Sequence, residues 1–330
     1  MSTPAPPIAA EQRRTAWFVF ALVLGLMWIV PFAGGGFLVF LGATVAIQAI
    51  AALGLQVMVG LAGQLSLGHA AFLGVGAYAC LLLQKNLGVP FVVATLAGAL
   101  CAGIAGLLMA QLVRLSGIYF KIATFGFGII AYQIFSNWIE VTGGHTGITN
   151  VPDIDLFGFK LSTTTELFVL AMLYLTAVYA LILRLTHGRI GRALKALGQN
   201  EDAARSIGIP VTAYKMAVIV IGSAVAGLAG SLIPHLYRFL NPESFGWLES
   251  LVLLIMITVG GLGSVPGAVI GAALLVIIPE YLRDFAEYKM LVYGILLIVC
   301  LVTLPRGVAG AIASIYGRWR AGMSKPGREH

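Results

Sequence analysis

Long apolar runs, separated by short charged or glycine-rich and proline-rich segments, are the feature that most constrains how this chain can fold. A helix needs about 20 apolar residues to cross the ~30 Å hydrocarbon layer of a membrane, and runs of this length recur about ten times. Hydrophobic residues make up 59% of the chain and charged residues only 10%, a balance that excludes an ordinary soluble domain. The sequence therefore predicts an all-α protein, a polytopic bundle of about ten transmembrane helices.

The apolar runs also predict where the spans lie. The expected spans are residues 16–33, 37–59, 67–84, 90–113, 118–139, 166–185, 216–236, 248–262, 266–282 and 288–304. The two spans around residues 260–267 also fit one broken element. The first run follows Arg13 and Arg14 and has no small-residue cleavage site after Val30, so we interpret it as an uncleaved span and not as a signal peptide.

The distribution of basic residues predicts the orientation in the membrane. With ten spans and the N-terminus inside, fifteen Lys and Arg residues fall on the inner side and five on the outer side. Because an excess of Lys and Arg marks the cytoplasmic side, we expect both termini in the cytoplasm. The net charge of +7 then reflects topology and does not indicate a nucleic acid partner. We expect one membrane domain over residues 1–330, with cytoplasmic tails at 1–15 and 305–330.

The longest inner loop, residues 186–215, is basic and helix-forming. Charge alone fits a loop that only sets the topology, but the internal order of this loop indicates more. Ile190, Ala193, Leu194 and Leu197 recur at helical spacing between basic residues, which gives the first half an apolar stripe. This pattern predicts a helix that can present an apolar face to another surface.

A second short helix is expected directly after the first. Asn200 is a suitable N-cap, and Glu201 and Asp202 fall in the first turn, where the helix dipole favours anions. Gly208 is placed for a left-handed C-terminal residue, and Pro210 prevents continuation of the helix. Two helices on the cytoplasmic face predict a docking surface for a soluble partner.

Two segments interrupt the helical pattern near the expected cytoplasmic side: GLAGQLSLGH at residues 60–69 and GGLGSVPG at residues 260–267. Non-helical backbone at this depth is tolerated only where protein or a water-filled cavity surrounds it. Gln64, Ser66 and His69 cluster in the first segment, either on a translocation pathway or in a structural hydrogen-bond network. Thr124 and Phe125 lie on a glycine-rich span that a small polar solute can approach, with packing as the alternative.

Several classes of chemistry are disfavoured by what the sequence lacks. The chain has no GxxxxGK[ST] motif for ATP and no HExxH or similar metal spacing. No carboxylate lies in the middle of an expected span, which disfavours a proton-coupled or sodium-coupled carrier. Cys80, Cys101 and Cys300 fall within expected spans and are interpreted as packing residues. We therefore expect neither an enzyme nor a metal site.

Six motifs occur in order along most of the chain. They are AGQLSLGHAAFLGVGAY (62–78), GIYFKIATFGFG (117–128), TGG followed by GI (142–148), GRIGRALKALGQNEDAARSIGI (188–209), NPESF (241–245) and VGGLGSVPGAVIGAALL (259–275). Together they closely resemble the LivM-type permeases of branched-chain amino acid ABC transporters. Within the loop, Asp202, Ala203, Ala204 and Gly208 match the EAA-xxx-G pattern that such permeases present to their ATPases, with Asp in place of the usual Glu. With Gly191, Arg192 and Glu201, they are the expected ATPase-coupling residues.

The resemblance implies a machine in the bacterial inner membrane. Its parts would be this chain, a second homologous permease of the LivH type, two cytoplasmic ATPases and a periplasmic solute-binding protein. ATP and Mg would bind to the ATPases, and no cofactor is expected on this chain. Branched-chain amino acids are the expected solutes. A permease of the same class for urea, short amides, aromatic acids or sugars, and a stand-alone secondary carrier or channel, are the alternatives.

Overall fold

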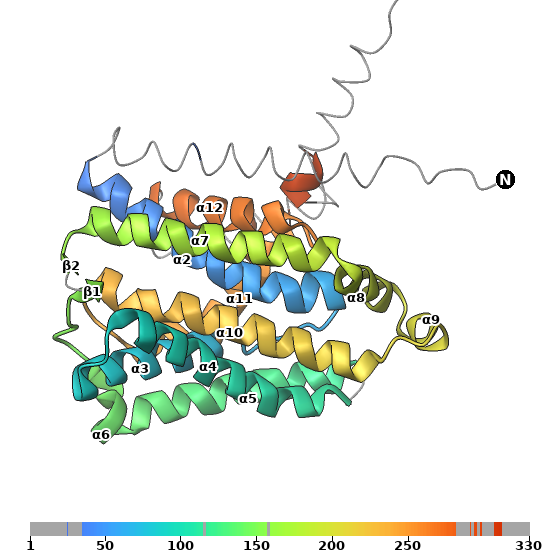
Figure 1. Cartoon of the computed structure of the whole chain (residues 1–330), viewed down its shortest axis with the longest axis horizontal. Coiled ribbons are helices and arrows are strands. Elements are labelled where there is room, and N and C mark those ends of the chain that lie inside the picture. Colours follow the sequence, from blue (N-terminus) through green and yellow to red (C-terminus); the bar gives the residue numbers. More distant parts are fainter. Residues whose placement is uncertain are drawn as a thin grey trace, which may run out of the picture.

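The computed structural model describes residues 35–114, 117–156 and 159–281, together with residues 25, 291, 294, 295, 298 and 307–311. Most of the expected spans at 16–33 and 288–304 and of the two expected tails lies outside these residues. In the described part, long helices run side by side in one bundle (Figure 1).

The elements of the bundle have the following bounds. The helices are α2 (Gly36–Gln56), η1 (Val57–Leu61), α3 (His69–Leu87), α4 (Phe91–Ala110), η2 (Gln111–Arg114), α5 (Ile118–Asn137), α6 (Ile139–Thr142), η3 (Gly144–Thr146), α7 (Thr164–His187), α8 (Arg189–Gln199), α9 (Glu201–Ser206), α10 (Val211–Tyr237), η4 (Pro242–Phe245), α11 (Trp247–Gly260) and α12 (Val265–Tyr281). The strands are β1 (Ile154–Leu156) and β2 (Phe159–Leu161), and they pair antiparallel.

Six helices of the described residues are long and apolar enough to cross a membrane: α2 with η1, α3, α4 with η2, α5, α7 and α10. Helices α11 and α12 pass the same test only as a pair and are bent by 120° at the break between them. The prediction of an all-α polytopic bundle is confirmed, and the region around residues 260–267 is the broken element that the sequence left open.

Small residues let the helices of the bundle approach closely. Helix α10 packs against α2 through Gly222 and Gly54, where a Cβ on Gly54 would lie 2.7 Å from the Gly222 carbonyl oxygen. Helix α4 packs against α10 in the same way, because a Cβ on Gly106 would lie 2.6 Å from the Cβ of Ser223. Close backbone contact of this kind stabilises helix pairs where lipid provides no hydrophobic drive.

One end of the bundle, called the hairpin end here, is formed by residues 138–163 with residues 238–240. It contains α6, η3 and the β1–β2 hairpin, and lies at the left in Figure 1. No strand was predicted here from the sequence, because each strand has only 3 residues. Arg238 donates a 2.6 Å hydrogen bond to Asp153 and a 3.1 Å hydrogen bond to the Ser162 carbonyl, which ties α10 to the hairpin.

Candidate functional site

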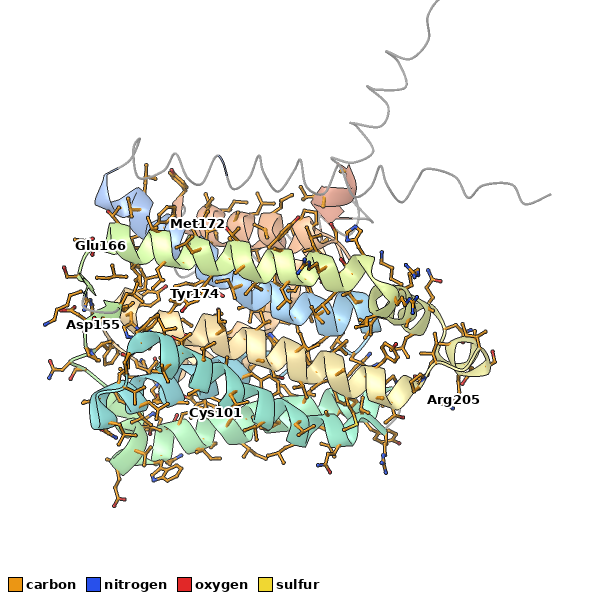
Figure 2. The ribbon with its side chains drawn as sticks, in the orientation of Figure 1. Cys101, Asp155, Glu166, Met172, Tyr174 and Arg205 are labelled. Carbon is orange, nitrogen blue, oxygen red and sulfur yellow. The ribbon has the colours of Figure 1, made fainter. Side chains whose placement is uncertain are left out.

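Helix α8 lies at the opposite end of the bundle from the hairpin end, and α9 projects furthest from it (Figure 1). Figure 2 marks this separation, with Arg205 of α9 at one end and Asp155 and Glu166 at the other. Leu194 and Leu197 are buried, whereas Ile190 stays 47% exposed. The predicted helix with an apolar stripe is confirmed, but most of the stripe packs against its own chain.

Helix α9 begins and ends where the sequence predicted. The side chain of Asn200 accepts a 3.0 Å hydrogen bond from the backbone N–H of Ala203, which satisfies one free donor of the first turn. After the helix, Gly208 has a φ of +82°, a left-handed conformation that a residue with a Cβ adopts at a cost. Pro210 is then the N-cap of α10. We call α8 and α9 the coupling helices.

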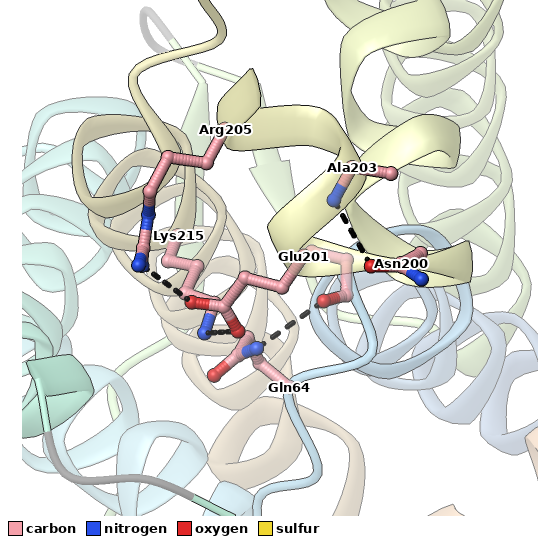
Figure 3. A network of polar contacts seen from close by, with 7 residues as sticks. Gln64, Asn200, Glu201, Ala203, Arg205 and Lys215 are labelled. Carbon is pink, nitrogen blue, oxygen red and sulfur yellow. Dashed lines mark hydrogen bonds and ion pairs between the residues drawn. The ribbon is translucent and has the colours of Figure 1, made fainter. Parts of the chain in front are cut away.

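An ion-pair cluster joins the coupling helices to the long helix α10 (Figure 3). Lys215 of α10 lies 2.6 Å from one carboxylate oxygen of Glu201, and Arg205 lies 3.4 Å from the other. The Lys215 side chain is only 11% exposed, so this pair is better shielded from solvent than the pair with Arg205. The Glu201–Lys215 pair therefore connects α9 to α10.

The seven predicted coupling residues differ in how exposed they are. Arg192, Asp202, Ala203 and Gly208 are exposed, and Glu201 is half-buried in the ion-pair cluster. Gly191 and Ala204 are buried within their own chain, and a Cβ on Gly191 would overlap the carbonyl of Thr186 at the end of α7. Only the first four thus have the accessibility that contact with another protein requires, whereas Gly191 forms the close α7–α8 corner.

The C-terminal end of α8 touches the end of the second span. A Cβ on Gly198 would lie 2.7 Å from the carbonyl oxygen of Leu61, and a Cβ on Gly63 would lie 3.8 Å from the Gly198 Cα. Leu61 ends η1, a π-helix, and such turns are common at functional sites. The sequence did not predict the π-helix, because residues 57–61 show only an apolar run with one glycine.

The two interruptions of the helical pattern lie against each other. We call residues 62–68 the first break and residues 261–264 the second break. The Gln56 amide donates hydrogen bonds of 3.1 Å to the Gly261 carbonyl and 3.0 Å to the Ser264 carbonyl. A Cβ on Gly60 would lie 2.7 Å from the backbone nitrogen of Gly263. Gln56 was not among the predicted site residues, although an amide in an otherwise apolar span, which also holds Gln48, was the available signal.

The first break passes between α5 and α11. The Leu67 N–H donates a 3.2 Å hydrogen bond to the Thr124 hydroxyl on α5, and the Ala70 N–H donates a 2.9 Å hydrogen bond to Ser250 on α11. A Cβ on Gly68 would overlap the Thr124 carbonyl. Thr124 therefore holds the break in place, a structural role for a residue that was also predicted to lie on the pathway.

The other predicted pathway residues lie in or beside the first break. Ser66 and His69 are completely buried, and neither the Ser66 hydroxyl nor the His69 ring nitrogens have a hydrogen-bond partner among the described residues. The His69 ring lies near the Ala51 backbone without hydrogen-bond geometry. Gln64 donates to the carbonyl of Ala62 at 3.2 Å.

Phe125, the last of these pathway residues, is in edge contact with Trp247 of α11 at 6.2 Å between ring centroids. The predicted pathway residues are thus brought together around one segment. Their role in transport stays a prediction.

The described residues hold no group of three or more His, Cys, Asp or Glu side chains close enough to bind a metal ion. Cys80 is buried and Cys101 is exposed, whereas Cys300 lies outside the described residues.

Comparison with known proteins adds to this geometry. A family model for the permease component of branched-chain amino acid transport systems matches residues 37–301. The chain is 34% identical to the high-affinity branched-chain amino acid transport system permease protein LivM of Salmonella typhimurium, over 92% of this chain and 77% of that protein. It is also 34% identical to LivM of Escherichia coli, over 90% of this chain and 75% of that protein. The LivH permease protein of Escherichia coli is 32% identical over 46% of this chain and 50% of its own length. No solved structure matches at a significant level.

Proposed function

We propose, since the chain belongs to the family of permease components of branched-chain amino acid transport systems, that it is one of two homologous permease subunits of an ATP-driven importer for branched-chain amino acids. In this proposal a periplasmic solute-binding protein delivers the solute, and two cytoplasmic ATPase subunits bind the ATP and Mg. The importer lies in the bacterial inner membrane, with both termini of this chain in the cytoplasm. The permease itself catalyses no reaction and binds no cofactor.

The observation that carries the proposal is the contact between the coupling helices and the first break. Arg192, Asp202, Ala203 and Gly208 offer an exposed surface to the ATPases. Gly198 of α8 lies against Leu61, where the π-helix leads into the first break. ATP-bound and nucleotide-free ATPase pairs present different surfaces, so they favour different positions of α8. The contact at Leu61 passes that difference to the first break.

The unpaired polar groups of the first break support an alternating-access cycle. A buried hydroxyl or imidazole without a hydrogen bond costs about 1–3 kcal/mol each. Ser66 and His69 have no hydrogen-bond partner among the described residues and would have this cost in the conformation described here. We propose that the other conformation exposes these side chains to water or solute, which would satisfy them and give the first break two states of similar free energy.

Reconstitution into proteoliposomes tests the function. The chain is combined with the LivH-type permease, the ATPase pair and the solute-binding protein of its own transport system. We expect ATP-dependent uptake of leucine, isoleucine and valine, and no uptake when the ATPases carry a substitution that prevents hydrolysis. Preferred uptake of urea, acetamide, benzoate or glucose would establish an alternative solute. Uptake by this chain alone would contradict the proposal and identify a carrier or channel.

A further inference from the structure

Helix α5 lies along one edge of the bundle (Figure 1), and the described residues cover little of it. Only 28% of its most apolar window is buried, the smallest share among the spans of the described residues. Its buried side faces the first break and η4, through Thr124, Gly128 and Phe135. The opposite side of α5 has no neighbour within the described part of the chain.

Helix α4 provides a comparison within the same molecule, because its exposed side carries no polar residue. The strongly exposed residues in its membrane-spanning part are apolar: Val93, Leu96, Leu100, Cys101, Ile104, Leu107 and Leu108. This composition is expected where only acyl chains contact the helix, because lipid offers no hydrogen-bond partner.

The exposed side of α5 differs from this pattern. It carries Gln133 and Asn137 among Ile129, Ile130 and Ile134, and Gln133 lies four residues inside the end of the span. The Asn137 amide nitrogen donates to the Gln133 carbonyl at 2.8 Å and to the Gln133 side-chain oxygen at 3.0 Å. These bonds use one amide atom of each side chain. The remaining donors and acceptors need a partner that is not hydrocarbon.

The surface around these residues is open. Ile130, Gln133, Ile134, Asn137 and Trp138 form one exposed, nearly flat strip along α5. Gly126 lies four residues before Ile130 on α5, and a Cβ on it would meet no atom of the described residues within 4 Å. A glycine that faces open space lets a second helix approach the backbone, and Gln and Asn side chains form hydrogen bonds between membrane helices.

We propose that the exposed side of α5, from Ile122 to Asn137, is the interface with the homologous LivH-type permease of the same importer. This inference rests on the proposed function and names the surface at which the two permeases meet. The chain is similar both to LivM and, over 46% of its length, to LivH, so the two subunits share a fold and are expected to associate about a pseudo-two-fold axis. In such an arrangement α5 faces its counterpart in the partner.

Site-specific photo-crosslinking in the assembled importer tests this interface. A benzophenone label is attached at Gln133→Cys in a chain that lacks the three native cysteines, and at Leu100→Cys on α4 as the matched control. We expect the adduct of the Gln133→Cys variant to contain the LivH-type permease, and the Leu100→Cys variant to react with lipid. If Gln133→Cys does not assemble, Ile130→Cys takes its place on the same side of α5.

Three outcomes would overturn the interface: adducts of the α5 label with lipid only, with a second copy of this chain, or with residues 16–33 or 288–304 of the same chain. Oxygen accessibility of a spin label at Ile130→Cys gives an independent readout, and a collision rate as high as at Leu100→Cys would also overturn it.

Uptake in the same proteoliposomes separates this proposal from the proposed function. Active uptake of branched-chain amino acids with lipid adducts at α5 would remove only the interface. Adducts with the LivH-type permease, but without such uptake, would leave the interface and remove the solute assignment.

Discussion

The two ends of the bundle are held together in different ways. At the hairpin end, side chains from distant segments bind each other: Arg238 pairs with Asp153, and His235 is 2.9 Å from the Gln84 side chain. At the coupling end, where α8, α9 and the two breaks meet, directed bonds occur beside close backbone packing at glycines. Glu201 pairs with Lys215 and Gln56 binds the second break, whereas Gly198 meets the Leu61 carbonyl by backbone packing. A packing contact has no directional bond to break, so we expect movement at the coupling end to occur where Gly198 meets Leu61.

The largest effect is expected from a single methyl group on α8. In Gly198→Ala, the new Cβ would press on the Leu61 carbonyl and alter the contact between α8 and the first break. We predict that ATP-driven uptake falls at least about tenfold, equivalent to ~1.4 kcal/mol in the rate-limiting barrier. The control is Gly188→Ala before the other end of α8, where a Cβ lies 3.4 Å from its nearest neighbour. If the two variants insert equally into the membrane and take up solute at equal rates, the contact between Gly198 and Leu61 has no special role in transport.

The second prediction concerns the hydrogen bonds between α2 and the second break. Gln56→Leu removes the bonds from Gln56 to the Gly261 and Ser264 carbonyls, which keep backbone donors from Ser264 and Ala268. We expect the purified protein to lose about 0.5–1.5 kcal/mol of stability per lost hydrogen bond, measured as a lower midpoint of thermal unfolding. The control, Thr258→Val, removes a hydroxyl that donates only to its own helix, at Leu254. If both variants unfold at the same temperature, the bonds of Gln56 do not stabilise the contact between α2 and the second break.

A third prediction separates residues that stabilise the first break from residues that act in transport. Thr124→Val removes the acceptor of the Leu67 N–H and should lower thermal stability by ~1 kcal/mol or more. Ser66→Ala removes a buried hydroxyl without a partner among the described residues, so stability should be unchanged or higher while uptake changes. A Ser66→Ala variant that is less stable and transports normally would assign Ser66 to structure and remove it from the pathway.

The smallest effect is expected at the hairpin end. Both partners of the Arg238–Asp153 pair are 46% exposed, and such pairs contribute about 1 kcal/mol or less. Asp153→Asn should therefore lower the unfolding midpoint slightly and leave the rate of ATP-driven uptake unchanged when the solute-binding protein is saturating. A loss of uptake as large as that in Gly198→Ala would show that this end also moves.

The comparison also shows what the sequence determines locally. The start of α9 at Asn200 and the left-handed Gly208 were predicted, because caps depend on a few neighbouring residues. The two breaks were predicted from their glycines, and the sequence placed them at the same depth.

The contact between α2 and the second break was not predicted, because it joins Gln56 to residues more than 200 positions away. The inward packing of Gly191 and Ala204 was missed for a different reason. A small residue in a motif fits a docking surface and a tight corner of its own chain equally well, and only the burial of these two residues separates the alternatives. The hairpin was missed because its short strands carry little periodic signal.

The central claim is that movement of α8 reaches the first break through Gly198 and Leu61. The most direct test is the reaction rate of a thiol reagent with Ser66→Cys, in complexes without nucleotide and in complexes trapped with ATP. Both cysteine variants are made in a chain from which the three native cysteines have been removed. Asp155→Cys in the hairpin serves as the reference position. The account predicts that the rate at residue 66 differs between the two states, that Gly198→Ala abolishes this difference, and that residue 155 reacts equally in both states. A rate at residue 66 that is the same in both states, or a difference that persists in Gly198→Ala, would contradict it.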